Sequence, residues 1–317
     1  MSPQETSSQG RTAGAGTPVP TAATGPVVVG VDGSARSLDA VDVAAREAAL
    51  RRHPLHVTHA YLWPYVAVPP GAVPVSRSDD ALRRDAERVV REAVDRARSV
   101  APSVGITGEV DVGAPVPALL ERSRTATLVV IGDRGLGGFT GLLVGSVAVE
   151  LAAHAASPVL VARGSPEPTG DVLVGVDGSP AGEVAVAFAF AEAALRGSGL
   201  AALYAWTDPA WYDLSGMQFV ATDPTRLEAE AERVLAEPVA RWHERYPEVP
   251  VRFRLVRGRA PQALIEASAG AQLVVVGSRG RGGFTGLLLG SVSQALLHHA
   301  ACPVAVVRAG LARRAAE

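Results

Sequence analysis

The sequence repeats itself once, with a constant offset of 145 positions between the two copies. Asp32 returns as Asp177 and Gly132 returns as Gly277, so no net insertion or deletion separates the copies. Between residues 132–147 and their counterparts, 13 of 16 positions are identical. A period of this length is too long for one unit of a solenoid, which spans about 20–50 residues. We therefore expect a duplicated domain and two similar folding units in tandem.

The composition agrees with two domains of ordinary size. The chain has 317 residues, of which 48% are hydrophobic and 20% charged, and this is enough to build two separate cores. We expect the domains to be residues 26–163 and 171–308, joined by a short linker, 164–170, that holds them against each other. Residues 1–25 are rich in small and polar residues and lack the apolar core of a secretory signal, so we expect a disordered tail there. Residues 309–317 are expected to form a C-terminal tail.

Each copy alternates short apolar strands with amphipathic helices. The strands expected in the first copy are Val27–Val31, Leu55–Leu62, Glu109–Val112, Leu128–Ile131 and Pro158–Ala162. This alternation predicts an α/β fold, with a doubly wound, five-stranded parallel sheet in each domain that is covered by helices on both faces. In the second copy Pro238 replaces Ala93 within the long helix, and we expect that helix to bend or break there.

Charge and residue usage exclude several classes of function. The chain has 30 basic and 32 acidic residues, and this balance argues against nucleic acid as a main partner. All the basic residues are arginine, which removes the Walker A loop, the kinase lysine and Schiff-base chemistry. Cys302 is the single cysteine and we expect it to be buried and inert, as in a reduced compartment. The apolar runs are too short to span a membrane and the histidines lack metal-binding spacing, so we expect a soluble, cytoplasmic protein without a metal site in the chain.

Two loops at the ends of strands carry the chemistry of each copy. The first strand runs into Asp32, and the fourth runs into a glycine loop with the pattern G-x2-G-x9-G-S, from Gly132 to Ser146. In an open doubly wound sheet, the carboxyl ends of these two strands flank the crevice in which ligands bind. Glycines let backbone N–H groups approach a ligand, and a helix that starts at Ser146 would point its free N–H groups at a phosphate. Asp32 and the loop should therefore face one cavity.

Two plainer interpretations of these residues stay open at this point. Asp32 and Ser146 can each be the N-cap of the helix that follows, without a ligand. Because the chain has no lysine, the charge of a phosphate would be met by backbone amides, by a divalent cation, or by Arg134 and its counterpart Arg279. Arg279 can equally be a solvated surface charge.

The pattern G-x2-G-x9-G-S after a hydrophobic strand, with aspartate at the end of the first strand, resembles the ATP-binding branch of the universal stress protein family. The resemblance covers residues 26–163 and 171–308, and it implies a fold similar to the adenine nucleotide alpha-hydrolases with ATP as ligand, together with Mg²⁺. The implied ATP-binding residues are Asp32, Ala60, Gly113, Gly132, Gly135, Gly145 and Ser146 in the first copy, and Asp177, Ala205, Gly258, Gly277, Gly280, Gly290 and Ser291 in the second.

The same resemblance implies a role for each class of residue. The two aspartates would contact the ribose or the adenine side of the pocket, and the two alanines would offer backbone groups to the base. The glycine loops and their serines would line the triphosphate, while Gly113 and Gly258 would serve the ribose or pocket closure. The family often carries a His-Val pair at the second strand, whereas this chain has His59-Ala60 and Tyr204-Ala205.

The resemblance implies an ATP-binding module for a stress response or signalling, with at most slow ATP hydrolysis. One alternative is a slow ATPase or a related α/β enzyme that adenylates a substrate or carries flavin, and another is a scaffold without ligand. Asp133 is the only additional acid in the first loop and its counterpart is Ser278, so hydrolysis that depends on it would be confined to one site. The last strands, Pro158–Ala162 and Pro303–Val307, are apolar sheet edges that we expect to pair within one chain. A homodimer of whole chains is a further possibility.

Overall fold

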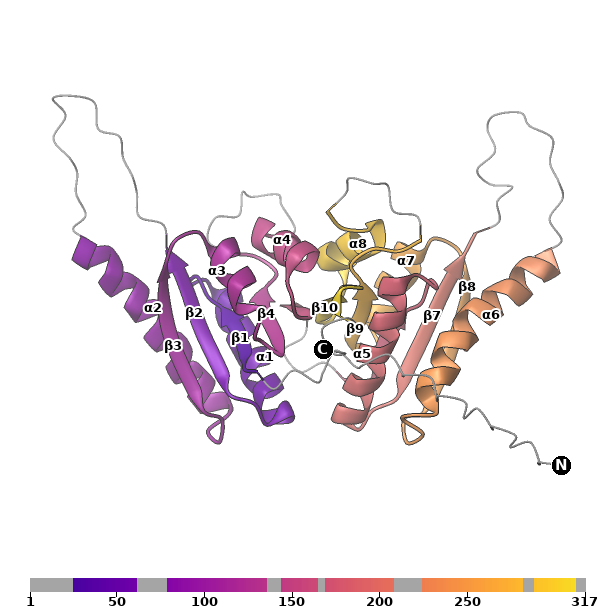
Figure 1. Ribbon diagram of the computed structural model, residues 1–317, viewed down its shortest axis with the longest axis horizontal. Helices are drawn as coiled ribbons and strands as arrows, with labels where there is room; N and C mark the ends of the chain where they lie inside the picture. Colours follow the sequence, from indigo (N-terminus) through magenta and orange to yellow (C-terminus); the bar gives the residue numbers. More distant parts are fainter. Residues whose placement is uncertain are drawn as a thin grey trace, which may run out of the picture.

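The computed structural model describes residues 25–61, 79–135, 144–164, 169–207, 224–281 and 288–311. These residues form two similar halves that lie side by side, with the later strands of each half at the centre (Figure 1). No helix in the described part of the chain is both long and apolar enough to cross a lipid bilayer.

The first half is a regular alternation of strands and helices, as the repeat pattern predicts. Its elements are β1 (Val27–Gly30), α1 (Ala35–Arg51), β2 (Leu55–Tyr61), α2 (Asp79–Val100), β3 (Ile106–Val112), α3 (Pro115–Arg122), β4 (Leu128–Gly132), α4 (Ser146–His154) and β5 (Val159–Ala162). The third strand begins three residues earlier than the apolar pattern indicates, because Ile106 is followed by the exposed Thr107 and Gly108, which interrupt that pattern.

The second half follows the same order. Its elements are β6 (Asp171–Gly175), α5 (Pro180–Arg196), β7 (Leu200–Trp206), α6 (Pro224–His243), β8 (Val251–Arg257), α7 (Ala260–Ser268), β9 (Ala271–Gly277), α8 (Ser291–His299) and β10 (Val304–Val307). We expected α6 to bend or break at Pro238, and a break is wrong, since the helix continues through the proline. Leu235, Val239 and Trp242 are buried against the core on both sides of the proline, and this packing holds the helix together.

The strands form one sheet of ten, in the order β3-β2-β1-β4-β5-β10-β9-β6-β7-β8. Neighbours are parallel within each half, and β5 and β10 are antiparallel where the halves meet. Leu160 lies opposite Ala305, its own counterpart in the repeat, so the halves are related by an approximate twofold axis. The predicted pairing of the two final strands within one chain is confirmed.

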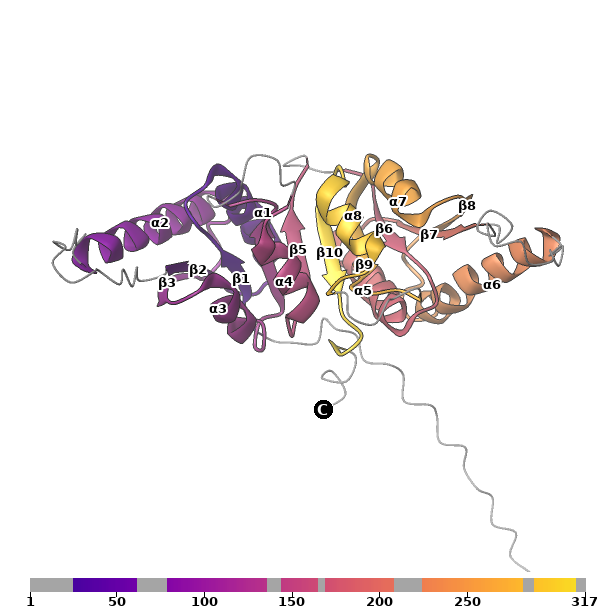
Figure 2. The same ribbon diagram turned by 90° about the horizontal axis from the view of Figure 1, so that it is seen from above.

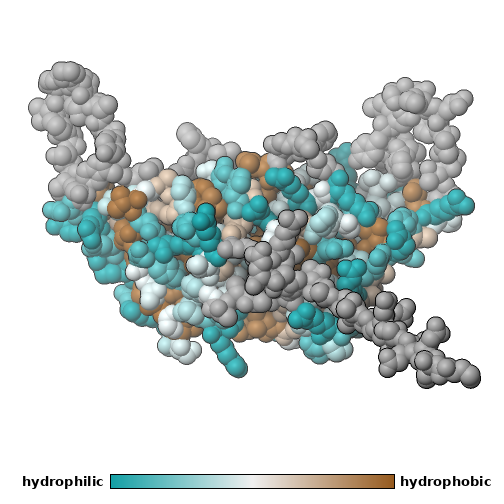
Figure 3. All heavy atoms as spheres, viewed as in Figure 1, coloured by the Kyte–Doolittle hydropathy of each residue, from teal (hydrophilic) through white to brown (hydrophobic). Residues whose placement is uncertain are grey.

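The helices form one layer on each face of the sheet (Figure 2). Helices α1, α2, α5 and α6 pack on one face, and α3, α4, α7 and α8 pack on the other. Successive residues of β1 point to opposite faces of the sheet. Val27 and Val29 pack in the core beneath α1 and α2, and Val28 packs in the core beneath α3 and α4. The outer ends of the molecule, where α2 and α6 lie, are mainly hydrophilic (Figure 3).

Four charged side chains are enclosed where α1 meets α5. Arg51 forms ion pairs with Glu47 on its own helix and with Glu192 on the other. Arg196 completes the set, with Nη2 lying 2.6 Å from Glu47 Oε1 and 2.9 Å from Glu192 Oε2. Two of these ion pairs cross between the domains, Arg51 with Glu192 and Arg196 with Glu47, and each is the repeat counterpart of the other. We call the four residues the interdomain charge cluster.

Two arginines connect the last strand of each domain to a helix of the other. Arg163, which follows β5, donates to the carbonyl oxygens of Leu296 and His298 near the end of α8, both at 3.0 Å. Arg308, which follows β10, donates to the carbonyl oxygens of His154 and Ala155 at the end of α4, at 2.7 and 2.9 Å. A cation at a helix C-terminus satisfies carbonyl groups that have no partner in the helix and complements its dipole.

Cys302 lies just before β10 and is buried, as predicted. Burial raises the pKa of the Cys302 thiol to about 12, which keeps the thiol protonated and unreactive at neutral pH.

Candidate functional site

Each domain has a cavity at the carboxyl ends of its strands. The cavity in the first domain measures about 520 Å³ and its counterpart in the second about 480 Å³. Both lie where the strand order reverses, at β1 and β4 in one domain and at β6 and β9 in the other. Predicted site residues line both cavities: Asp32, Ala60, Gly132, Gly135, Gly145 and Ser146 in the first, and Asp177, Ala205, Gly277, Gly280, Gly290 and Ser291 in the second.

A tight turn after β1 places Asp32 at the cavity. Gly33 has a φ of 82°, a left-handed conformation that favours glycine, and the turn lets Asp32 Oδ1 accept a hydrogen bond from the Ser34 N–H at 3.0 Å. The N-cap of α1 is Ser34, whose hydroxyl accepts from the N–H of Ser37 at 3.1 Å. The interpretation of Asp32 as a helix cap is therefore wrong, because the cap is the serine two residues later.

The glycine loop packs directly against this aspartate. A Cβ atom at Gly135 would overlap Asp32 Oδ2, and one at Gly280 would overlap Asp177 Oδ2. Only glycine permits this close approach of the loop backbone to the carboxylate. In the second domain the N–H of Arg281 also donates to Asp177 Oδ2 at 3.1 Å, so the loop and the carboxylate are linked directly.

The helices that follow the loops begin without a side-chain cap. The N-caps of α4 and α8 are Gly145 and Gly290, which have no side chain, whereas serines cap α1 and α5. Ser146 is the first helical residue, so the interpretation of Ser146 as the N-cap is wrong. The first turn of α4 lines the cavity and presents N–H groups and the positive end of the helix dipole. This arrangement suits an anion such as a phosphate.

The backbone of Ala60 lies beyond the end of the neighbouring strand. Strand β1 ends at Gly30, and the carbonyl oxygen of Val31 lies 2.7 Å from Nδ1 of His59. Ala60, the next residue of β2, lines the cavity. In the second domain Tyr204 stands in the place of His59, and Ala205 lines the cavity in the same way.

Gly113 and Gly258 are not among the residues that line the two cavities. They directly follow the edge strands β3 and β8, where their N–H groups donate to the carbonyl oxygens of Tyr61 and Trp206, both at 2.9 Å. In the structure they extend the pairing between strands, and their assignment to the ribose or to pocket closure stays a prediction.

The arginines of the glycine loops line the cavities, whereas Asp133, the additional acid of the first loop, does not. Arg134 lines the first cavity and Arg279 lines the second. Asp133 is 5% exposed and is not part of the lining; its Oδ1 lies 3.7 Å from Arg36 Nε and makes no hydrogen bond within the described residues. Residues 136–143 and 282–287, which complete the two loops, lie outside the described part of the chain.

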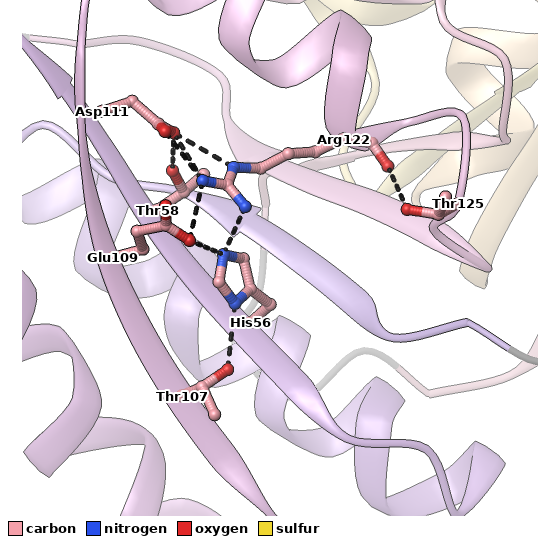
Figure 4. A network of polar contacts seen from close by, with 7 residues as sticks. All are labelled: His56, Thr58, Thr107, Glu109, Asp111, Arg122 and Thr125. Carbon is pink, nitrogen blue, oxygen red and sulfur yellow. Dashed lines mark hydrogen bonds and ion pairs between the residues drawn. The ribbon is translucent and has the colours of Figure 1, made fainter.

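The first domain contains a polar network that the sequence analysis missed (Figure 4). Thr58 on β2 lines the cavity, and its hydroxyl lies 2.6 Å from Oδ2 of Asp111 on β3. Arg122 on α3 donates to both oxygens of Asp111, at 2.8 Å to Oδ1 and 3.0 Å from Nε to Oδ2. Arg122 Nη1 also lies 2.8 Å from Nε2 of His56, whose Nδ1 lies 2.9 Å from the hydroxyl of Thr107. The local signal was weak, because β2 also carries His56 and His59, and Thr58 does not stand out in it as a polar residue.

Charge states within this network follow from its geometry. Burial raises the pKa of Asp111, but hydrogen bonds from Arg122 and Thr58 outweigh burial and hold it below its ordinary value. Burial and the nearby Arg122 lower the pKa of His56, which fits a neutral ring that accepts from Arg122. Asp111 is thus a carboxylate and His56 is uncharged near neutral pH.

The second domain has no counterpart of this network. The positions equivalent to Thr58, Asp111 and Arg122 are Leu203, Val256 and Ala267, all apolar. The two cavities therefore share the aspartate and the glycine loop but differ at Thr58 and Leu203, and also at Ala148, whose counterpart in the second lining is Ser293. No group of three or more His, Cys, Asp or Glu side chains suited to a metal occurs among the residues that the structure describes.

Known proteins agree with the architecture and with the duplication. The family model described as the universal stress protein family matches residues 24–163 and again 169–308. Universal stress protein Rv2005c of Mycobacterium tuberculosis is 43% identical over 293 residues, which cover 89% of this chain and 96% of that protein. A crystal structure of a universal stress protein from Archaeoglobus fulgidus has a TM-score of 0.64 at 18% identity and covers 90% of this chain and 96% of its own.

Single domains match as well. A universal stress protein crystallised in complex with cAMP is 34% identical over 45% of this chain and all of its own, with a TM-score of 0.36 to the whole chain. The two family matches together cover nearly all of the described residues, and the relatives extend over the whole tandem arrangement. The chain belongs to the universal stress protein family.

Proposed function

We propose that each domain binds one ATP molecule and that the protein acts as a nucleotide-dependent module in a stress response or in signalling. The observation that supports this most strongly is the shared construction of the two cavities. In each, a carboxylate packs against a glycine loop, and an uncapped helix N-terminus faces the same space. Cavities of about 500 Å³ fall within the range of small-molecule sites.

The parts of ATP match the parts of the cavity. The ribose hydroxyls are donors, and the carboxylate of Asp32 or Asp177 can accept from them. The phosphates would lie at the first turn of α4 or α8, next to Arg134 or Arg279. The base would then reach the backbone of Ala60 or Ala205 at the second strand.

Mg²⁺ would enter these sites together with the triphosphate. Magnesium commonly keeps several water ligands and binds substrate phosphates with one or two protein oxygens, so a cage of protein carboxylates is not required. Ser146 and Ser291 are at the first turn of the two helices and line the cavities, so their hydroxyl oxygens can serve as neutral ligands. The ion would supply charge neutralisation for the phosphates.

A binding module fits the site better than an efficient ATPase. Hydrolysis requires a group that orients the attacking water, and Asp133 is buried outside the lining of its cavity, with Ser278 in its place in the second domain. We therefore propose at most slow hydrolysis. Bound nucleotide would instead stabilise one conformation of the glycine loops and so bias the binding of a partner in the cytoplasm.

Two measurements on the purified protein test this proposal. Mass spectrometry of the nucleotide released on denaturation should detect ATP, and a turnover assay should give a rate well below about 1 per second. Release of flavin, or turnover at ordinary enzyme rates, would favour the related α/β enzymes instead. A protein that neither carries nor binds any nucleotide would be a scaffold.

A further inference from the structure

We propose that Thr58 makes the first site selective for bases that carry an exocyclic amino group, whereas the second site lacks this selectivity. The inference rests on the proposed nucleotide binding and adds that the two sites are not equivalent. The observation behind it is a polar network that backs the wall at Thr58 and has no counterpart at Leu203, which holds the equivalent place in the second cavity.

Thr58 lies where the base is expected. It precedes Ala60 by two residues on β2, so the two residues are on the same face of the sheet, and both line the cavity. It pairs with Gly30, the last residue of β1, next to the turn that carries Asp32. Only 2% of its surface is exposed, so a small part of Thr58 faces the cavity, and a hydrogen bond made to it is shielded from water. Hydrogen bonds made or missed in such a place have a large effect on affinity.

The network behind Thr58 fixes the direction of its hydroxyl. Thr58 Oγ1 lies 2.6 Å from Asp111 Oδ2, and an ionised carboxylate can only accept hydrogen bonds. The hydroxyl proton is therefore directed to Asp111, and the oxygen retains only its lone pairs for a ligand. Thr58 thus offers the cavity an acceptor and no donor.

Asp111 is held in place by its own partners. Arg122 donates to both carboxylate oxygens, and Arg122 Nη2 also lies 3.1 Å from Glu109 Oε2. These contacts keep Asp111 ionised and immobile, so Asp111 and Arg122 act as positioning residues for the hydroxyl of Thr58 (Figure 4). In the second domain the three equivalent positions are apolar, and Leu203 offers neither a donor nor an acceptor.

Adenine and hypoxanthine differ in the substituent at position 6, the group that would contact the hydroxyl oxygen of Thr58. The amino group at position 6 of adenine donates to Thr58, whereas the oxygen at position 6 of hypoxanthine places a second acceptor against it. A lost hydrogen bond in a buried site, combined with repulsion between acceptors, predicts a preference for ATP over ITP of about tenfold at the first site. The second site should discriminate less, by about twofold or under.

The two sites can be measured separately with single-site variants. Gly290→Val leaves the first site intact and Gly145→Val leaves the second, and both positions have a φ near −70° that valine accepts. A Cβ at Gly145 would come no closer than 3.8 Å to other atoms, whereas one at Gly290 would lie 3.3 Å from the Cα of Arg279, so that loop must shift by a few tenths of an ångström. Calorimetric titration of each variant with ATP and with ITP, both with Mg²⁺, gives the two ratios of dissociation constants.

Substitutions in the Gly290→Val background then test the role of Thr58. Thr58→Val should reduce the preference for ATP to that of the second site, and Thr58→Ser should retain it. Asp111→Asn should shift the preference toward ITP, because the amide can donate to Thr58 and so release its hydroxyl proton for the base oxygen. A merely structural role of the network would change both affinities together and leave their ratio unchanged.

The outcomes separate this inference from the proposed function. Tight ATP binding with equal affinity for ITP at the first site, or an unchanged ratio in Thr58→Val, would overturn the selectivity while leaving nucleotide binding in place. Binding of neither nucleotide by folded Gly290→Val protein, with the fold checked by circular dichroism, would overturn both. In the second site Leu203→Thr serves as the matched control and should gain no preference, since Val256 cannot orient the new hydroxyl.

Discussion

Arg51 on α1 and Glu192 on α5 form an ion pair across the boundary between the two domains, and the side chain of Glu192 is fully buried. Its symmetric copy joins Arg196 to Glu47. Burial raises the pKa of Glu47, but Arg196 and Arg51 outweigh burial and hold it below its ordinary value, so the cluster stays charged. The two domains are therefore joined by charges as well as by the β5–β10 pairing.

Removal of one acid from the interdomain charge cluster should destabilise the whole chain. Glu192→Gln leaves two arginines with a single carboxylate in a buried place, and an uncompensated buried charge costs about 3–5 kcal/mol of unfolding free energy. Urea denaturation followed by circular dichroism measures the change. As the matched control, Glu230→Gln breaks the exposed pair with Arg233 and should leave the midpoint almost unchanged. Equal effects of the two substitutions would contradict a buried, essential cluster.

The two interdomain arginines should protect helix ends in the opposite domain. Arg163→Gln removes a charged donor from the last turn of α8, and Arg308→Gln does the same for α4. Hydrogen bonds from charged groups contribute about 1.5–3 kcal/mol each, so each substitution should loosen its target helix. Hydrogen exchange should become faster at the end of α8 in the first variant and at the end of α4 in the second. Faster exchange within the substituted domain instead would show that the contacts do not act across the boundary.

His56 should make stability depend on pH. Its pKa is lowered in the folded protein, so below the ordinary value of about 6.5 the unfolded chain binds a proton that the folded chain resists. Stability should therefore fall as the pH drops from about 7 to about 5, and His56→Gln should show a shallower decline. Denaturation midpoints of both proteins across this range give the difference. A constant difference between them at every pH would mean that His56 does not titrate in this way.

The halves of the chain should recognise each other when produced separately. Residues 26–163 and 171–308 would each expose an apolar strand, β5 or β10, whose partner in the intact chain is the other half. Light scattering should find homodimers of each half or a complex between them. Whole chains, in which these two edges are already paired, should associate less readily. If both halves stay monomeric and do not bind each other at high concentration, the pairing of β5 with β10 does not drive their association.

The sequence predicted those features that depend on chain order and local chemistry. Asp32 and Gly132 follow strands whose carboxyl ends share an edge, so the meeting of the turn and the glycine loop follows from the fold class. The roles of Ser34 and Gly145 as N-caps were missed because nearby residues, Asp32 two positions before Ser34 and Ser146 directly after Gly145, are equally plausible caps by residue type.

The same reasoning could not predict contacts between residues that are far apart in the sequence. Thr58, Asp111 and Arg122 come from two strands and a helix, and only the register of β2 with β3 brings the first two together. The interdomain charge cluster was equally hidden, although its members are repeat counterparts: Glu47 matches Glu192 and Arg51 matches Arg196. A residue near a twofold axis lies close to its own copy, so this signal becomes readable only once the position of the axis is known.

The central claim, one ATP site in each domain, is tested most directly by the stoichiometry of ATP binding. Isothermal titration should find two ATP per wild-type chain, one in Gly145→Val, one in Gly290→Val, and none in the double variant, because a side chain at these N-caps takes up space in cavities that they line. Gly145 and Gly290 are both only partly buried, so all four proteins should fold, with Gly290→Val the more destabilised single variant because its Cβ lies 3.3 Å from the Cα of Arg279. A double variant that binds ATP with the stoichiometry and affinity of the wild type would contradict the assignment of both sites.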